Sequence, residues 1–364
     1  MRRQKVHSFS HQAMGTFFAV FVAGQEEDYS RSAAGAFFRE IDRLEGFLSR
    51  FDERSEISRI NRLKPGEILP VGIETCECLK LSFKLMVETG GAFNVNFRAI
   101  KNLNRGYQKP GKAGKREMEL FNKSRVEVVR RGHPLKEKKS EKKRLKRTMA
   151  EERERLQGQE ISGPRPEPAD ESSLSGELKA DFFVSIFPLE LIEQKGSYAA
   201  VRLDVPGAEL DLDPGAIGKG YALEKAAGIF PDWGIQDFLI NAGGSTVYGC
   251  GQKPWPVAVG GGFDFFRPGR IYLQGRSLSG SGHEVKGEHI FDPRRRRALS
   301  RHLAVWVSHP SPAVADGLST AFMVMNLKEI EAYARTHPET WILVLSRDRK
   351  SHFFSQMDIY EPGV

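Results

Sequence analysis

Cysteine is scarce in this sequence, which carries only Cys76, Cys78 and Cys250. An odd number disfavours a disulfide framework, and the close pair Cys76 and Cys78 has no second pair to complete a zinc site. We therefore expect a reducing compartment, the cytoplasm. Long apolar runs are also missing: the run over 17–23 is short and is followed by Gln-Glu-Glu-Asp. This pattern argues against a signal peptide and against a membrane span.

Most of the chain has no excess of positive or negative charge. The formal net charge is +8, but residues 104–179 hold 21 Lys and Arg against 13 Asp and Glu, so the whole excess lies there. The remainder is formally neutral, and basicity therefore says nothing about its active site.

The segment 104–179 differs from the rest in composition. Residues 136–155 are almost uninterrupted charge, and residues 163–176 are rich in Pro, Ser and Glu. We interpret 104–179 as an insertion that combines a solvated helix with a flexible linker. Binding to RNA or to an acidic partner is the less favoured alternative, because aromatic residues are not interleaved with the charges. We expect no nucleic-acid partner.

The parts 1–103 and 180–364 contain the patterns of a folded core. Residues 28–48 and 73–89 carry apolar side chains at helical spacing, and Ser55 is placed to cap a short helix that reaches Asn61. Runs rich in β-branched and aromatic residues predict strands at 7–23, 181–186, 200–204, 237–242, 255–259, 270–274 and 304–308.

The stretch 209–228 organises the chain. Leu210 and Leu212 alternate as in a strand, the pattern breaks at Pro214-Gly215, and helical spacing follows from 218. Glycines at such a turn let backbone N–H groups approach an anion, and Lys219 adds a charge for phosphate, with Asp213 beside it. The spacing fits neither a Walker A loop nor a dinucleotide fingerprint. A plain glycine-rich turn with a solvated lysine is the alternative for this stretch alone.

Near the C-terminus, Asp316 and Thr320 lie four residues apart and so share one face of a predicted helix. A carboxylate and a hydroxyl are hard oxygen ligands of the kind that Mg²⁺ accepts when substrate phosphate completes its shell. Taken alone, the pair also fits an exposed Asp and a helix-facing Thr.

Seven stretches together resemble the ApbE family, the FAD:protein FMN transferases. They occur in the family's order, cover nearly all of the chain outside 104–179, and form a far stronger signal than any one stretch. As they stand here, they are Ala13-Met-Gly-Thr16, Leu48-Ser-Arg-Phe51 with Ser55-Glu-Ile-Ser-Arg-Ile-Asn61, Thr89-Gly-Gly-Ala-Phe-Asn94, Asp211-Leu-Asp-Pro-Gly-Ala-Ile-Gly-Lys-Gly-Tyr221, Asn241-Ala-Gly-Gly244, His289-Ile-Phe-Asp-Pro293 and Ala315-Asp-Gly-Leu-Ser-Thr-Ala321.

The resemblance implies an α+β fold, related to the T-fold, with mixed sheets and flanking helices around a central cleft for FAD. It also implies Mg²⁺-dependent transfer of FMN from FAD to a Thr or Ser hydroxyl of a target flavoprotein, with release of AMP. His289 would be the catalytic residue. By position, the residues that contact FAD would be Met14, Phe51, Ala92, Phe93, Asn94, Asp213, Lys219 and Ile290, and the metal ligands would be the Ala216 carbonyl, Asp316 and Thr320.

The residue types make chemical sense of that reaction. A hydroxyl that attacks phosphorus needs a base, and His289 is a residue that titrates near neutral pH. Mg²⁺, Lys219 and helix N–H groups would meet the charge that builds on the phosphoryl oxygens.

Two positions depart from the family pattern. Family members commonly carry Asp where Asn94 stands, and often an acidic or small residue where Ser319 stands. Asn94 can form hydrogen bonds but cannot take a proton, so a carboxylate near the flavin or the metal is missing. Two alternatives to transfer therefore stay open, namely hydrolysis of FAD to FMN and AMP by water, and non-catalytic FAD binding.

Overall fold

A computed structural model describes residues 5–105, 186–260, 269–282, 290–355 and 357–362 of the chain. The predicted insertion, 104–179, lies almost entirely outside these residues, and so do His289 and most of the strand expected at 181–186. The described residues combine helices with antiparallel sheets, which confirms the α+β class.

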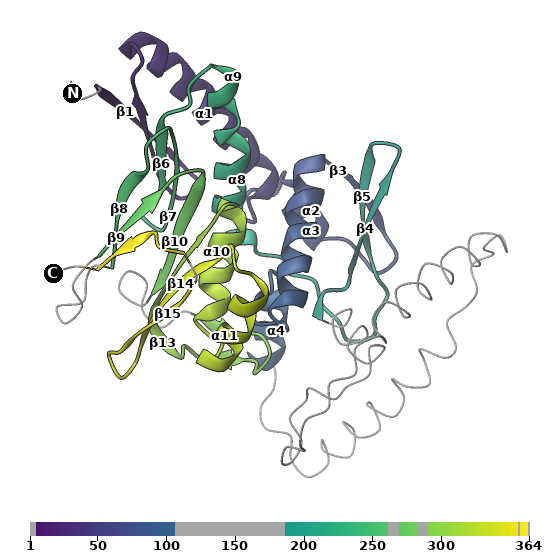
Figure 1. Ribbon diagram of the computed structural model, residues 1–364. Coiled ribbons are helices and arrows are strands. Elements are labelled where there is room, and N and C mark those ends of the chain that lie inside the picture. The colour runs from purple at the N-terminus through teal and green to yellow at the C-terminus, as the bar shows by residue number, and fades with distance from the viewer. Residues whose placement is uncertain (1–4, 106–185, 261–268, 283–289, 356, 363–364) are drawn as a thin grey trace. The chain divides into compact units, whose positions relative to one another are not determined.

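An eight-stranded antiparallel sheet is the largest element of the fold (Figure 1). Its strand order is β1-β2-β6-β7-β10-β13-β14-β15. The strands span Val6–Ala13, Thr16–Ala23, Phe238–Ala242, Thr246–Cys250, Arg276–Gly282, His302–His309, Trp341–Ser346 and Ser351–Phe354, respectively. The strands predicted at 237–242 and 304–308 are thus confirmed as β6 and β13, and they lie on either side of β7 and β10.

Smaller sheets complete the strand content. One has the order β3-β5-β4, with strands Ile68–Val71, Ser197–Arg202 and Leu189–Gln194. Another has the order β16-β9-β8, with strands Tyr360–Glu361, Gly269–Leu273 and Trp255–Val259, and β11 (Phe291–Asp292) pairs with β12 (Arg297–Ala298). The predicted strands at 255–259 and 270–274 are therefore confirmed, and the one at 200–204 is confirmed in part.

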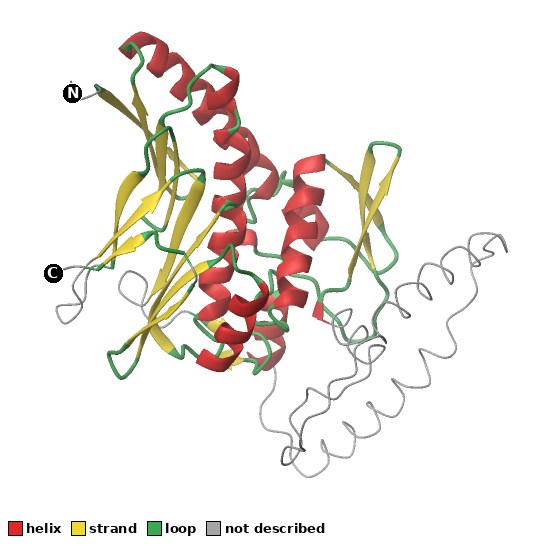
Figure 2. Cartoon of the chain, viewed as in Figure 1, coloured by secondary structure: helices red, strands yellow, loops and turns green. Residues whose placement is uncertain are grey.

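Helices lie between the eight-stranded sheet and the sheet β3-β5-β4 (Figure 2). Within this layer, α10 packs on β10 and β13 of the large sheet and also on α8, which in turn packs on α1. The helices are α1 (Glu27–Leu48), α2 (Glu56–Asn61), α3 (Ile73–Glu88), α4 (Phe97–Arg105), the short 3₁₀ turn η2 (Pro214–Ala216), α8 (Gly218–Ala227), α9 (Ile229–Asp232), α10 (Pro312–Phe322) and α11 (Leu327–Thr336).

The helices form where the sequence pattern placed them. On α1, Phe37, Ile41, Leu44 and Leu48 recur at intervals of three and four residues, and all are at most 3% exposed. The Ser55 hydroxyl accepts a hydrogen bond from the Ser58 N–H at 3.0 Å and so caps α2 as predicted. The predictions for 28–48 and 73–89 are confirmed by α1 and α3.

The single strand predicted over 7–23 is wrong, because this stretch forms the hairpin β1–β2. Its two-residue turn is Met14-Gly15, with φ of 51° and 69°. Positive φ at both central residues is the geometry that matches the twist of a two-residue hairpin. The Met14 N–H donates to Glu45 Oε2 at 2.7 Å, so a side chain of α1 stabilises the turn. Apolar alternation continues on both sides of the turn, which is why the pattern resembled one strand.

The strand predicted around Leu210 and Leu212 is also wrong. Both side chains are buried, but the segment pairs with no strand of the described chain, and its backbone groups bond to the side chains of Asn61 and Asn96. Alternating burial was therefore predicted correctly, while the hydrogen-bond partner was not.

Two clusters of apolar side chains form the interior. The larger one joins α1, α3, α8 and α10 to the inner face of the large sheet, and the smaller one, with Leu273 and Trp341, joins that sheet to β8 and β9. Cys76 and Cys78 are buried in α3, and burial raises the pKa of the Cys78 thiol to about 12. These two cysteines behave as core residues.

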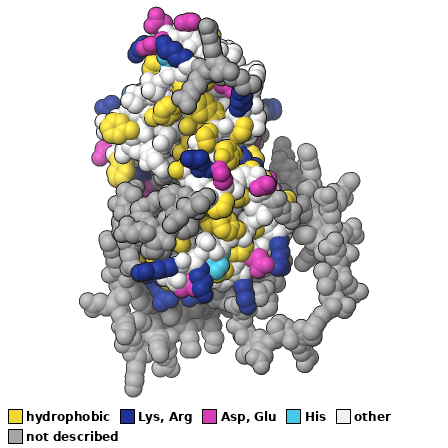
Figure 3. Space-filling model, turned by 60° about the vertical axis from the view of Figure 1, so that its left-hand side comes forward, with side chains coloured by type: hydrophobic (Ala, Val, Ile, Leu, Met, Phe, Trp, Pro, Cys, Tyr) yellow, Lys and Arg dark blue, Asp and Glu magenta, His cyan; other side chains and the backbone are white. Residues whose placement is uncertain are grey.

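The surface carries both charge signs. On the face shown in Figure 3, Lys and Arg lie among Asp and Glu and form no continuous basic area on the part that the structure describes. Among the described helices, none combines the length and the apolar character that crossing a bilayer requires.

Burial of His302 predicts that acid weakens the fold. Its Nε2 lies 2.8 Å from the Met325 carbonyl oxygen and therefore carries the proton, while its buried Nδ1 has no partner among the described residues. Burial lowers the pKa of His302 in the folded state, so the unfolded chain binds more protons once the pH falls below about 6.5. The part of the stability that depends on His302 is therefore complete above that pH and declines below it.

Thermal unfolding measured between about pH 8 and about pH 5.5 tests this prediction. The variant His302→Gln keeps a donor for Met325 but does not titrate, so its midpoint should fall less on acidification than that of the wild type. The matched change His11→Gln, at an imidazole beside Asp42 on the surface, should not reduce the loss. If the unfolding midpoint of His302→Gln fell as much on acidification as that of the wild type, burial of His302 would not be the cause of the decline.

Candidate functional site

The candidate site is built where α8 and α10 come closest. A Cβ added to Gly220 would collide with the carbonyl oxygen of Pro312 and would lie 2.8 Å from Cβ of Asp316. Only glycine permits this approach. In the C-terminal half of α8, the Glu224 carboxylate accepts hydrogen bonds from the Ser311 hydroxyl, at the N-terminal end of α10, and from the Ala313 N–H at 3.3 Å. The two helices therefore hold each other in register.

Asp316 is the central carboxylate of the site and is only 4% exposed. Its Oδ2 accepts from the Gly220 N–H at 3.1 Å and lies 3.4 Å from Lys219 Nζ. On the other side, Oδ1 lies 3.2 Å from the Thr246 hydroxyl and 3.3 Å from the Ser279 hydroxyl. Four donors from α8, β7 and β10 thus satisfy a buried carboxylate, as burial of such a group requires.

Lys219 connects this carboxylate to the η2 turn. Its Nζ lies 3.4 Å from the Gly215 carbonyl oxygen and 3.4 Å from Asp316 Oδ2, which brings Ala216, the next residue of the turn, to the same region. The Asp213 carboxylate caps η2 by accepting from the Gly215 N–H at 3.0 Å. Lys219 thus links the turn to Asp316 of α10.

Hydroxyl groups surround the following turn of α10. Ser281 Oγ lies 2.9 Å from Ser319 Oγ and 3.4 Å from Thr320 Oγ1, and Ser319 donates to the Asp316 carbonyl at 2.9 Å. No group of three or more His, Cys, Asp and Glu gathers as a metal site in the described part of the chain. One carboxylate with hydroxyl and carbonyl oxygens nevertheless fits Mg²⁺, which keeps several water or phosphate ligands of its own.

Met14 lies at the N-terminus of α8. A Cβ added to Gly218 would be 3.8 Å from Met14 Cε, so the hairpin turn places this side chain against the first residue of the helix. The glycine leaves room there. A strand end and a helix start that lie far apart in sequence thus meet at the candidate site.

Phe51 is 84% exposed, which is unusual for a large aromatic ring. The Arg50 guanidinium lies over the ring at 4.7 Å from its centroid, and Arg50 Nε lies 3.6 Å from Asp213 Oδ2. Arg50 Nε is also buried without a hydrogen-bond partner among the described residues. Sequence reasoning named Phe51 but missed Arg50, although it lies within the same matched motif.

The loop after α3 brings a further group of predicted residues together. The Phe93 N–H donates to the Thr89 hydroxyl at 3.0 Å, and the ring, 2% exposed, packs against α10 at Gly317. Asn94 Oδ1 accepts from the Asn96 N–H at 2.7 Å, whereas Asn94 Nδ2 is buried without a partner in the described chain. An unused buried donor of this kind fits a ligand contact. Ala92 is 4% exposed.

The hydrogen bond that Ile290 forms lies within its own loop. It is 8% exposed, and its carbonyl accepts from the Leu299 N–H at 3.1 Å. The buried Asp292 accepts from the Arg294 N–H at 3.0 Å, and Arg294 reaches Glu329 of α11 at 2.7 Å. The loop is thus tied to α11, and the preceding His289 lies outside the described residues.

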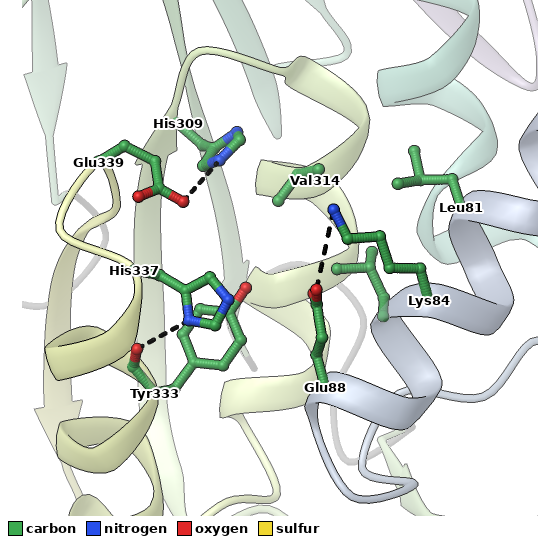
Figure 4. A pocket seen from close by; sticks show the side chains of 9 residues that line it. Leu81, Lys84, Glu88, His309, Val314, Tyr333, His337 and Glu339 are labelled. Carbon is green, nitrogen blue, oxygen red and sulfur yellow. Dashed lines mark hydrogen bonds and ion pairs between the residues drawn. The ribbon is translucent and has the colours of Figure 1, made fainter. Parts of the chain in front are cut away.

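A small pocket of about 90 Å³ lies near the N-terminal end of α10 (Figure 4). His309 Nε2 lies 3.7 Å from Glu339, Lys84 lies 3.7 Å from Glu88, and the His337 ring stacks on Tyr333 at 3.9 Å. Burial lowers the pKa of His309. None of the predicted site residues lines this pocket, and pockets that hold drug-sized ligands are several times larger.

Comparisons with known proteins are consistent with this geometry. A family model described as the ApbE family matches residues 14–154 and 163–344. A protein of Klebsiella pneumoniae named FAD:protein FMN transferase is 22% identical over 89% of this chain and 80% of its own length. One of Rhodobacter capsulatus with the same name is 35% identical, over 34% of this chain and a quarter of its own length.

Solved structures show the same fold. The apo form of a flavinyl transferase ApbE from Pseudomonas stutzeri superposes with a TM-score of 0.63 at 20% identity, over 98% of this chain and 97% of its own. The ApbE-like α+β fold expected from the sequence is thereby confirmed.

The approach of α8 and α10 predicts that Gly220→Ala destabilises the protein. The added methyl group would force the helices apart and move Asp316, at a cost of about 1–3 kcal/mol in the free energy of unfolding. Gly46→Ala is the matched control, because a Cβ there meets nothing within 4 Å and should instead stabilise α1 by about 0.5 kcal/mol. Urea unfolding measures both changes, and equal effects of the two substitutions would contradict the close approach.

Proposed function

Since the chain belongs to the ApbE family, we propose that it is a flavin transferase that moves FMN from FAD to a Thr or Ser hydroxyl of an acceptor flavoprotein and releases AMP. The observation that carries this proposal is Lys219 between the Gly215 carbonyl and Asp316, at the start of α8. A lysine, an anchored carboxylate and the N-terminus of a helix form a set of groups suited to a diphosphate and a divalent cation.

The proposed reaction is a substitution at the phosphorus of the FMN half of FAD. The acceptor oxygen forms a new bond to that phosphorus, the bond to the bridging oxygen breaks, and AMP leaves with that oxygen. The hydroxyl proton goes to a base, for which we propose His289. Acceptor and FAD must be held together for this step, so positioning and charge stabilisation supply most of the rate enhancement.

For the metal, we propose Mg²⁺ held by the Ala216 carbonyl, Asp316 and Thr320. When bound, it would neutralise charge on the phosphoryl oxygens. Ser319 stands where family members often carry an acidic or small residue, and its hydroxyl is already engaged with Ser281 and with the Asp316 carbonyl. The site then contributes a single carboxylate, so we expect Mg²⁺ to bind mainly together with FAD.

For FAD, we propose contacts from the residues that the family pattern marks. Phe51 offers an exposed ring beside the cation of Arg50, and Asn94 offers an unused buried donor. Phe93 would contribute through its backbone, because its side chain is buried against α10. The remaining proposed contacts come from Met14, Ala92, Asp213, Lys219 and Ile290.

We propose that 1–103 and 180–364 form the catalytic core and that 104–179 is a charged insertion within it. Two buried cysteines with no disulfide partner among the described residues favour a reducing compartment, and we propose the cytoplasm.

Transfer is tested by mass spectrometry of a flavoprotein domain that carries a candidate acceptor Thr, after incubation with the protein, FAD and Mg²⁺. The acceptor should gain one FMN, and its Thr→Ala form should not. AMP released at the same rate without acceptor would point instead to hydrolysis of FAD. FAD binding without any product would point to a non-catalytic role.

Lys219→Gln tests the proposed phosphate site. Loss of the ammonium group should slow transfer by about 10²-fold or more, since a charge aimed at the reacting phosphate acts mainly on the transition state. Lys225→Gln is the matched control, because Lys225 lies in the last turn of α8 and pairs with Glu77. Its transfer rate should stay near that of the wild type. Equal rates for both variants would rule out this role for Lys219.

A further inference from the structure

Among the strands that the structure describes, none pairs with the segment 209–213, which leads into the η2 turn. It is extended and partly buried, so its backbone N–H and C=O groups need partners from elsewhere. Two asparagine side chains bond to four of these groups, one at the end of α2 and one in the loop after α3. This arrangement holds the approach to the candidate site in place.

Asn61 bonds to both backbone groups of Leu212. Its Oδ1 accepts from the Leu212 N–H at 2.7 Å, and its Nδ2 donates to the Leu212 carbonyl at 3.0 Å. A carboxamide carries the same donor and acceptor as a peptide group, so Asn61 acts as one residue of a missing neighbouring strand.

Asn96 bonds to backbone groups of two other residues of the segment, Asp211 and Glu209. Its Oδ1 accepts from the Asp211 N–H at 2.7 Å, and its Nδ2 donates to the Glu209 carbonyl at 2.9 Å. The side chain is 1% exposed, so these bonds form out of contact with water. Losing one of them would leave a buried group unpaired.

These bonds connect the segments that carry the proposed FAD contacts. Asn61 ends the helix whose capping residue, Ser55, donates to the carbonyl of Ser49, two residues before Phe51. Asn96 follows Asn94, whose Oδ1 accepts its N–H. The next backbone bond of the segment runs from the Asp213 N–H to the Val95 carbonyl at 2.7 Å.

We propose that Asn61 and Asn96 are positioning residues of the FAD site. They fix Asp213 and the η2 turn relative to Phe51 and Asn94, and this role rests on the proposed function. Neither side chain needs to touch FAD. Their effect would appear in the affinity for FAD and in KM, with little change in kcat once FAD is bound.

Asn61→Asp is the test, because it replaces the donor with an oxygen of nearly the same shape. At about pH 8 the carboxylate would face the Leu212 carbonyl and repel it, and FAD should bind about tenfold more weakly or worse. At about pH 5.5 a carboxyl group placed against a carbonyl favours its protonated form, which can donate again, so affinity should recover toward that of the wild type.

The controls separate this role from general destabilisation. Asn61→Ala should bind FAD weakly at both pH values, because it cannot regain a donor. Asn326→Asp should behave as the wild type, since Asn326 caps α11 by accepting from the Glu329 N–H and a carboxylate accepts as well. Fluorescence titration with FAD measures all four proteins.

Hydrogen exchange of the peptide 209–213 distinguishes the two proposals. Asn61→Asp should exchange faster there than the wild type at about pH 8, without FAD and without a change elsewhere. If the wild type binds no FAD, the proposed function fails, and exchange alone decides whether the two side chains hold the segment. Unchanged FAD affinity of Asn61→Asp at the higher pH, or weak binding that does not recover at the lower one, would overturn the positioning role.

Discussion

The contact of α8 with α10 at Gly220 is the constraint on which the candidate site depends. The absence of a side chain at this position lets the Gly220 N–H reach the Asp316 carboxylate, and the next residue back, Lys219, approaches the same oxygen. A carboxylate, an ammonium group and the N-terminal end of a helix are thereby concentrated within one turn of each helix. The large sheet supplies the remaining contacts of this carboxylate, because the hydroxyls of Thr246 and Ser279 lie within hydrogen-bond distance of its other oxygen.

Much of the fold and part of the candidate site could be predicted from the sequence, because these features depend on residues that are close together in the chain. Helical spacing in α1 and α3, the cap at Ser55 and the glycine turn before Lys219 depend on neighbouring residues, and these were predicted correctly. The order of seven short stretches then indicated the family. What failed depends on distant partners: the turn at Met14-Gly15 is stabilised by Glu45, and the segment at Leu212 pairs with a side chain from α2.

The residues that sequence reasoning missed share a physical property. Arg50 and Thr246 gain their importance from what they face, namely Asp213 for the first and Asp316 for the second. A serine or threonine on a buried strand looks like any other small residue until its partner across the sheet is known. Polar groups enclosed in this way act through an ordered set of hydrogen bonds, so their roles become visible only in the folded chain.

Asn96 has one more bond, from its Nδ2 to the Ile186 carbonyl at 3.0 Å. A single buried side chain thus closes a loop between residues 96 and 186, which lie 90 positions apart in the chain. Because the core itself closes this loop, the entropy cost of a longer connection rises only slowly with its length. A change in the length of the connection between residues 96 and 186 would therefore cost the fold little free energy, and the contact of α8 with α10 would keep its geometry.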